Sequence, residues 1–263
     1  MSEAATQEKT HPHGNFCWLE LSTTDAEAAK KFYTSVFGWS YVDNPMGPDA
    51  VYTMINLDGK GVGALYKKGP EQQGTPPNWM TYVSVANADE TVAKARELGG
   101  TPMMDAFDVD KHGRMSVITD PSGSIFSIWQ AKENPGVELY GPPGSMCWNE
   151  LQTRDTKKAS DFYTKLFGWT TKESPEYTEW VNQGMSIGGM MAMQPHMEGV
   201  PPHWLPYIRV TDCDKTAAAV KAAGGSLYVE PMDIPTVGRF SVAADPQGAV
   251  FAFIQLTGPH AQA

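Results

Sequence analysis

The chain of 263 residues has little cysteine and no long apolar run. Its three cysteines, an odd number, do not make a disulfide framework, so we expect a reducing, cytoplasmic setting. No stretch reaches the length of a membrane-spanning helix, which predicts that no part of the protein crosses a membrane. The opening segment, residues 1–13, is polar and lacks the apolar stretch of a signal peptide. We interpret it as a disordered tail.

Positive charge is scarce as well. The chain has 20 Lys and Arg residues against 30 Asp and Glu residues, and its net charge is −10. Nucleic acids and anionic membrane surfaces are bound by basic patches, and the sequence contains no run of basic residues. We therefore expect neither as a partner. Because 41% of the residues are hydrophobic, the chain can bury real cores.

The sequence repeats itself once. Residues Gly14–Leu21 match Gly144–Leu151 at a spacing of 130, and the turn Asp120–Gly123 matches Asp245–Gly248 at a spacing of 125. The first copy therefore carries five extra residues, which fall in a loop before Tyr52. A repeat of this kind predicts two structural units with the same order of elements.

Each copy divides further into two similar modules. Residues 16–22 alternate as a strand does, and Thr24 opens a capping-box pattern at the start of a helix that ends at Gly38. The dipeptide Asp58-Gly59 predicts a hairpin, and the order of strand, helix and strands then starts again at Trp79. We predict an α+β fold with a first domain over 14–132, a linker over 133–143 and a second domain over 144–257.

Two signatures in each copy are similar to those of a known superfamily. Asp25 follows a strand, Phe32-Tyr33 comes seven residues later, and Phe37-Gly38-Trp39 ends the helix, while an Asp-Pro-x-Gly turn precedes the last strand. On these residues the chain resembles the glyoxalase/bleomycin-resistance/dioxygenase (vicinal oxygen chelate) superfamily over 14–130 and 144–256. The resemblance implies paired βαβββ modules whose curved sheets enclose a cleft. It also implies functions that range from metal-dependent lyases and dioxygenases to antibiotic-sequestering proteins.

The resemblance further implies four metal-ligand positions per domain, usually occupied by His or Glu. In this chain they hold Trp18, Met80, Ser127 and a residue of 62–64 in the first copy, and Trp148, Leu205, Ala252 and a residue of 187–189 in the second. Indole, thioether, hydroxyl and alkyl groups do not replace imidazole and carboxylate around a divalent cation. We therefore predict no metal and no cofactor at these positions.

What remains is an aromatic cleft in each copy. Strand alternation places Glu20 beside Trp18 and Glu150 beside Trp148, facing the clefts. The other predicted ligand-binding residues are Met80, Tyr82, Ser127, Trp129, Leu205, Tyr207 and Arg209. A carboxylate buried there has a raised pKa, which suits a general base, but it could equally be a structural group bonded to Tyr82 or Arg209. The aromatic side chains could line an open pocket or fill the cleft as core.

Three functions stay open on this evidence. The leading one is a metal-independent small-molecule-binding protein that sequesters or converts a toxic metabolite. The alternatives are an enzyme of lyase, isomerase or dioxygenase type that uses Glu20 or Glu150, and a scaffold with filled clefts. The duplication predicts two domains related by a pseudo-twofold axis. The protein would then be a monomer with an internal pseudo-dimer, or a homodimer.

Overall fold

The computed structural model describes residues 11–48, 50–72 and 74–257. We refer to the elements from β1 to β9 as the first domain and to those from β10 to β17 as the second. The first domain consists of β1 (Phe16–Thr23), α1 (Ala26–Phe37), β2 (Ser40–Pro45), β3 (Val51–Leu57), β4 (Lys60–Lys67), η1 (Pro70–Gln72), β5 (Asn78–Ser84), α2 (Ala88–Glu97), β6 (Thr101–Pro102), β7 (Phe107–Val109), β8 (Gly113–Thr119) and β9 (Ile125–Ala131).

The second domain repeats this order. It consists of β10 (Met146–Thr153), α3 (Thr156–Phe167), β11 (Thr170–Glu173), β12 (Thr178–Asn182), β13 (Met185–Ala192), η2 (Pro195–Met197), β14 (His203–Arg209), α4 (Cys213–Ala222), β15 (Ser226–Ile234), β16 (Gly238–Ala244) and β17 (Val250–Leu256). None of the helices in the described part of the chain has the length and apolar character needed to cross a bilayer.

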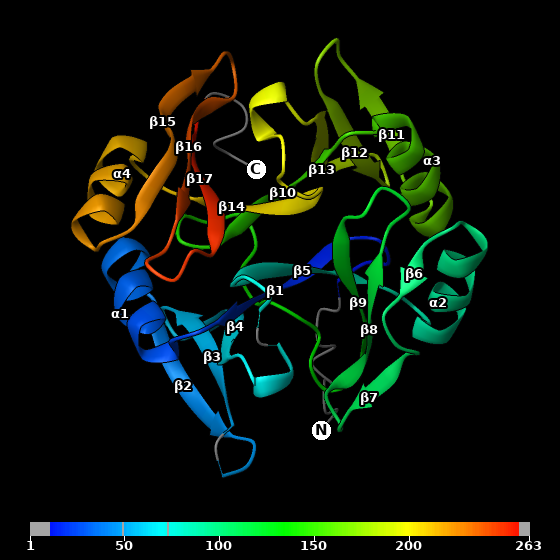
Figure 1. Cartoon of the computed structure of the whole chain (residues 1–263), viewed down its shortest axis with the longest axis horizontal. Coiled ribbons are helices and arrows are strands. Elements are labelled where there is room, and N and C mark those ends of the chain that lie inside the picture. The colour runs from blue at the N-terminus through cyan, green and yellow to red at the C-terminus, as the bar shows by residue number, and fades with distance from the viewer. Residues whose placement is uncertain (1–10, 49, 73, 258–263) are drawn as a thin grey trace, which may run out of the picture.

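Each domain forms one mixed sheet with the same strand order. The first runs β2-β3-β4-β1-β5-β9-β8-β6, with β7 paired to β8, and the second runs β11-β12-β13-β10-β14-β17-β16-β15. The shared order confirms the repeat and the α+β fold of paired modules. Figure 1 shows the two curved sheets back to back, with α1 beside α4 on one flank and α2 beside α3 on the other. The concave side of each sheet faces away from the other domain.

Local sequence signals explain most of the boundaries. Asp58 and Gly59 both have positive φ, 50° and 78°, which is the backbone of the tight hairpin that their sequence predicts between β3 and β4. Gly38 ends α1 in the left-handed conformation, with φ of 73°. The predicted cap at Thr24 is wrong by one residue, because the Asp25 side chain accepts the hydrogen bond from the backbone N–H of Ala28.

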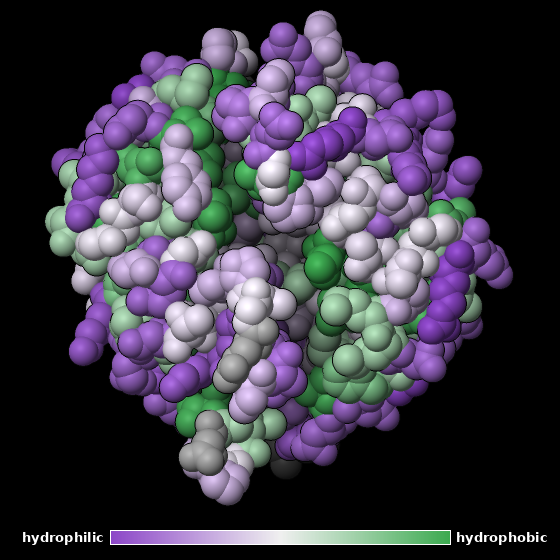
Figure 2. Space-filling view, viewed as in Figure 1, coloured by the Kyte–Doolittle hydropathy of each residue, from purple (hydrophilic) through white to green (hydrophobic). Residues whose placement is uncertain are grey.

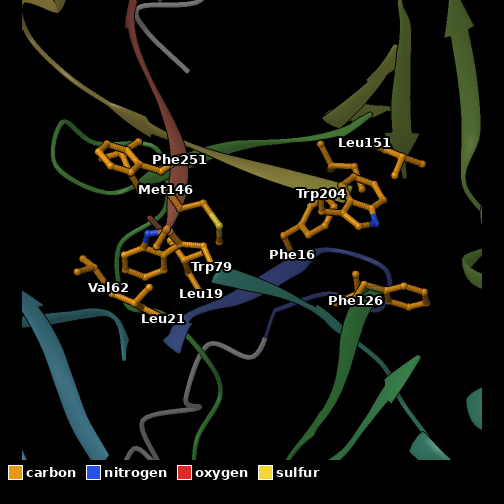
Figure 3. Close-up of a cluster of buried hydrophobic side chains, with 14 of the residues drawn as sticks. Phe16, Leu19, Leu21, Val62, Trp79, Phe126, Met146, Leu151, Trp204 and Phe251 are labelled. Carbon is orange, nitrogen blue, oxygen red and sulfur yellow. The ribbon is translucent and has the colours of Figure 1, made fainter. Parts of the chain in front are cut away.

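The main core lies between the two sheets. It buries side chains from the convex faces of both, and Figure 3 shows Phe16, Trp79, Met146 and Trp204 meeting there. The Phe16 ring packs edge-on against Trp204, with their centroids 5.3 Å apart. Since the largest buried cluster belongs to both domains, each domain depends on the other for much of its buried apolar surface.

Contacts across the domain boundary come in matched pairs. Tyr33 on α1 donates to the carboxylate of Asp245 at 3.0 Å, and Tyr163 on α3 donates to Asp120 at 2.9 Å. The indole N–H of Trp39 donates to the carbonyl of Gly144 at 2.7 Å, and that of Trp169 donates to Gly14 at 2.8 Å. A pseudo-twofold axis requires every bond from the first domain to the second to be repeated from the second domain to the first. These reciprocal bonds have that pairing.

A bulge interrupts the alternation of side chains near the start of β1. The pairing of β1 with β5 shifts register between Phe16 and Trp18, so that Cys17 packs in the same cluster as Trp18. The same irregularity occurs between Met146 and Trp148. Simple alternation, which would place Cys17 on the side of the helices, fails here because a β-bulge adds a residue to one strand of the pair.

The predicted disordered tail, residues 1–13, lies mostly outside the described residues, which begin at 11. Two histidines of the predicted tail make defined contacts. The His11 ring is hydrogen-bonded to the carbonyl of Val137 at 2.9 Å, and Asn182 donates to the carbonyl of His13 at 2.8 Å.

Candidate functional site

The residues at the four metal-ligand positions of the first domain lie on the concave face of its sheet. They lie on the four central strands, β4, β1, β5 and β9. In the strand register Glu20 is opposite both Ala64 and Met80, and Tyr82 is opposite both Trp18 and Ser127. The structure therefore brings these side chains together on one face of the first sheet.

Glu20 lies at the centre of this face, held by two tyrosines. The hydroxyl of Tyr52, from β3, donates to one carboxylate oxygen at 2.6 Å, and the hydroxyl of Tyr82, from β5, donates to the other at 2.9 Å. The indole N–H of Trp18 donates to the Tyr52 hydroxyl at 3.3 Å. The result is a chain of hydrogen bonds from indole to phenol to carboxylate, with a second phenol on the other side.

Burial raises the pKa of the Glu20 carboxyl above its usual range, although the bonds from Tyr52 and Tyr82 work in the opposite direction. Burial and the neighbouring Glu20 charge raise the pKa of both tyrosines well above 10. The phenols therefore remain protonated donors to the Glu20 carboxyl.

The second domain builds a similar but tighter arrangement. Glu150 is only 6% exposed. Its carboxylate accepts from the Gln152 amide at 3.0 Å and from the Tyr207 hydroxyl at 3.3 Å. Burial raises the pKa of Glu150, while hydrogen bonds from Gln152, Tyr177 and Tyr207 lower it. The hydroxyl of Tyr177 also accepts from the Trp148 indole at 2.8 Å.

Tyr177 occupies space at a position that the resemblance assigns to a metal ligand. Gly189 lies opposite Glu150 in the register, as Ala64 lies opposite Glu20. A Cβ atom at Gly189 would collide with the Tyr177 hydroxyl, so the absence of a side chain there makes room for the phenol. The place of a fourth ligand is thus taken by a tyrosine that directly precedes β12.

The other predicted ligand-binding residues of the first domain are closely packed. They belong to a buried cluster, separate from the main core, that consists of Cys17, Trp18, Ala64, Tyr82, Trp129 and Val137, with Tyr52, Met54, Met80 and Met115 packed against it. Trp18 is 5% exposed and Ser127 is fully buried, whereas Glu20 and Met80 are half-buried. The concave face of the first domain is therefore covered by its own side chains, and Glu20 and Met80 are partly exposed there.

The predicted residues of the second domain also come together, with one exception. Leu205, Tyr207, Ala252 and Ile254 form a buried cluster with the half-buried Trp148. Arg209 turns instead to the segment before β10, where its guanidinium donates to the Gly141 carbonyl at 3.0 Å. The bonds to Glu150 come from tyrosine and glutamine, not from Arg209 as we had considered.

The sequence-based site omitted Tyr52, Tyr177 and Gln152. A signal for the tyrosines exists, because they are 125 residues apart, the same spacing that relates the second modules of the two copies. Their role is visible only once β3 and β4 are paired, since that pairing brings Tyr52 onto the face that carries Glu20.

Comparison with known proteins places the chain in a family. The model of the glyoxalase/bleomycin resistance protein/dioxygenase superfamily matches residues 16–128 and again 137–253, so the chain belongs to this superfamily. It is 45% identical over 246 residues to the protein named "Putative glyoxylase CFP32" of Mycobacterium tuberculosis, covering 90% of this chain and 93% of that protein. It is 33% identical over 257 residues to the anthracycline biosynthesis protein DauV of Streptomyces sp. (strain C5), covering 91% and 92%.

Solved structures share the fold at much lower identity. An Mn(II)-bound glyoxalase from Novosphingobium aromaticivorans superposes with a TM-score of 0.65 at 15% identity, over 92% of this chain and 82% of that one. The dioxygenase LapB from Pseudomonas sp. KL28 gives 0.63 at 12% identity, over 94% and 95%. These likenesses establish the architecture of the two sheets, and function has to be argued from the side chains.

A divalent metal such as the Mn(II) of the Novosphingobium aromaticivorans glyoxalase does not fit the side chains of this chain. In the first cleft Trp18, Ala64, Met80 and Ser127 occupy the central strands, and the described residues contain no group of three His, Cys, Asp or Glu side chains that could hold an ion. Glu20 is a single carboxylate whose two oxygens already accept from phenols. A lone carboxylate binds divalent cations weakly.

We expect the purified and dialysed protein to hold no stoichiometric Mn, Fe, Ni or Zn. Elemental analysis by mass spectrometry measures this directly. About one equivalent of metal per domain, lost in the double variant E20Q/E150Q, would contradict the prediction and restore a metal-dependent site.

The titration of Glu20 should be visible in protein stability. Its folded-state pKa lies above the unfolded value of about 4.3, so the folded protein binds more protons between the two values and loses stability as pH rises through that window. Glutamine does not ionise. The E20Q variant should therefore gain thermal stability relative to wild type as the pH rises from about 4 to neutrality.

Asp43 provides a control of opposite sign. Hydrogen bonds from Lys30 and Thr53 lower its pKa, so the charged form stabilises the fold above the unfolded pKa. The D43N variant should lose stability relative to wild type as the pH rises from about 2 to about 4, which is below the window in which E20Q gains it. Thermal unfolding of wild type and both variants from about pH 2 to neutrality separates the two windows, and parallel curves for E20Q and wild type would show that Glu20 does not carry the shift.

Proposed function

We propose that the protein binds a neutral aromatic small molecule on the concave face of its sheet, without using a metal ion. The observation that carries the proposal is the cage around Glu20, a half-buried carboxyl with a raised pKa among tryptophan, tyrosine and methionine side chains. Binding sites for small molecules combine an apolar lining with a few placed polar groups, and this face has both.

The surroundings support an aromatic ligand. Indole and phenol rings stack with other rings, and methionine sulfur makes favourable contacts with ring edges. Figure 2 shows polar residues over most of the outer rim, with apolar residues gathered toward the middle, near β7–β9 of the first domain and β15–β17 of the second. The relative DauV is an anthracycline biosynthesis protein, and anthracyclines are aromatic molecules.

Sequestration or conversion of a toxic compound of this class is the biological role that we propose. Displacement of the half-buried Met54 and Met80 would admit the ligand, since unbranched thioether chains change rotamer at little cost. Glu20 would then orient the ligand, because the ionised carboxylate accepts from a ligand hydroxyl and the protonated carboxyl donates to a ligand carbonyl.

Titration with naphthol, a neutral two-ring phenol, tests the proposal. Trp18 and Trp129 lie in the cleft, so saturable binding should quench tryptophan fluorescence, and E20Q should change the affinity or its dependence on pH. Absence of saturable binding by naphthol, catechol and the larger hydroxyquinone quinizarin would reject the proposed function.

The same carboxyl supports a second candidate, an enzyme of lyase or isomerase type. Burial raises the pKa of this carboxyl, which makes it a better proton acceptor, and Tyr52 and Tyr82 hold it in one orientation. Turnover of a bound ligand by wild type that is lost in E20Q, while binding is kept, would favour this candidate over sequestration.

A further inference from the structure

We infer that the two clefts are not equivalent, and that only the first domain binds the ligand, a neutral ring system with an oxygen substituent that hydrogen-bonds to Ser127. The inference rests on the proposed function and deepens it. It follows from three differences between duplicated positions of the two domains.

The first difference is a buried hydroxyl without a partner. Ser127 lies on β9 opposite Tyr82, on the face of the sheet that carries Glu20, and its neighbours Phe126 and Ile128 point into the main core. Its Oγ atom has no hydrogen-bond partner among the described residues, and the side chain is fully buried. The duplicate position in the second domain holds Ala252, which has no polar group to satisfy.

A buried hydroxyl that bonds to nothing destabilises the folded protein, because it gives up its bonds to water. A ligand oxygen that forms a hydrogen bond with Ser127 would remove this loss of stability. The duplicate residue in the second domain, an alanine, has no hydroxyl and so causes no such loss. The first domain therefore has a polar group that can be satisfied by a ligand, and its position marks where the oxygen of that ligand would lie.

The second difference is the kind of side chain around the cleft. Met54, Met80 and Met115 pack at its edge in the first domain, and all three are half-buried. Their duplicates at a spacing of 125 are Glu179, Leu205 and Phe240. Methionine is unbranched and flexible, so this lining can open and close around a flat ring.

The second domain fills the same space with stiffer groups. Leu205 is 2% exposed, and the Phe240 ring packs against Tyr207 with centroids 6.3 Å apart. Glu179 is paired with Lys172 at 2.9 Å, so it belongs to the rim and is not free to line an apolar pocket.

The third difference is the state of the two carboxyls. Glu20 is half-buried and bonded to two phenols, whereas Glu150 is 6% exposed and has a further bond from Gln152. The residue that matches Gln152 in the first domain is Ser22, whose hydroxyl donates to Asn78 at 2.8 Å and leaves Glu20 to the tyrosines. The second carboxyl is therefore less exposed than the first and accepts one more hydrogen bond.

The chemistry of the ligand follows from this lining. Indole rings and thioethers favour a flat aromatic body, and the unpartnered Ser127 hydroxyl favours one ring hydroxyl or carbonyl. The neighbouring Glu20 and a net charge of −10 disfavour anions. A phenol or quinone without a charged substituent meets all three conditions.

Calorimetric titration of the full chain with naphthol and with naphthalene, which lacks the oxygen, tests the inference. We expect one equivalent of naphthol per chain. The S127A variant should weaken naphthol binding by about threefold to tenfold, the range expected for one neutral hydrogen bond, and should leave naphthalene binding unchanged. Because the Ser127 hydroxyl has no partner to lose, the thermal stability of S127A should equal or exceed that of wild type.

Ser116 provides the matched control. It is a fully buried serine on β8 of the same sheet, and its hydroxyl donates to the Met104 carbonyl at 2.8 Å. The S116A variant should lose thermal stability and keep the naphthol affinity of wild type, which is the reverse of S127A. Two equivalents of naphthol per chain, or a single equivalent that S127A does not weaken, would overturn the inference and leave the proposed function standing. No binding by either compound would reject both.

Discussion

Replacement of Phe32 by Ala should destabilise the whole protein by about 3–5 kcal/mol, and replacement of Phe162 should cost the same. Phe32 projects from α1 of the first domain into the second, where its ring lies so close to Gly225 that a Cβ there would come within 2.8 Å of it. Phe162 makes the reciprocal contact with Gly100 at 2.9 Å. Both rings are 2% exposed, so truncation leaves a cavity in the shared core.

Urea unfolding followed by tryptophan fluorescence measures the effect. Because the core is common to both domains, we expect one cooperative transition whose midpoint falls equally in the two variants. Phe107, which is 39% exposed at an edge of the first sheet, is the control, and F107A should cost less than about 1 kcal/mol. Separate transitions for the two domains, or unequal losses in F32A and F162A, would contradict the shared core.

Much of the fold could be predicted because its signals are local or repeated. The hairpin at Asp58-Gly59 and the helix end at Gly38 follow from backbone conformations that few residues adopt. The duplication then required both halves to have the same strand order. The bulge at Cys17 is different, because it depends on how β1 pairs with a strand about 65 residues later, which alternation along one strand does not encode.

The bond of Tyr82 to Glu20 was among the alternatives that the sequence offered, but the other bonds of the two carboxyls were not predicted. Alternation places Trp18 and Glu20 on one face, and the structure does bring them together with Tyr82. Two partners of the carboxyls were missed because they lie outside the strand that carries the carboxyl. Tyr52 is on β3 of the first domain, and Tyr177 directly precedes β12 of the second. Whether a cleft is closed depends on the rotamers of side chains such as Met80, and rotamers follow from packing in three dimensions.

The first domain expressed alone, as residues 11–140, should assemble into a homodimer and should not persist as a folded monomer. Separation removes the partner for the convex face of its sheet and exposes the shared core to water. The missing contacts can be restored by a second copy, because the groups that the second domain supplies are duplicated in the first. Asp120 matches Asp245 as the acceptor for Tyr33, and Gly14 matches Gly144 as the acceptor for Trp39. At the centre of the shared core, Phe16 of the second copy would occupy the place of Met146. The core around this position must therefore repack.

Sedimentation equilibrium gives the mass of the fragment, and we expect twice the chain mass at micromolar concentration. The segment up to residue 140 is kept because the backbone N–H groups of Val137 and Glu138 donate to Cys17 and Gly61. F32A in the fragment removes two rings per dimer, so it should abolish assembly and folding together, whereas F107A should leave the dimer intact. A folded monomer with a cooperative unfolding transition would show that the first domain is stable without any partner, and that the duplicated contacts do not stabilise its fold.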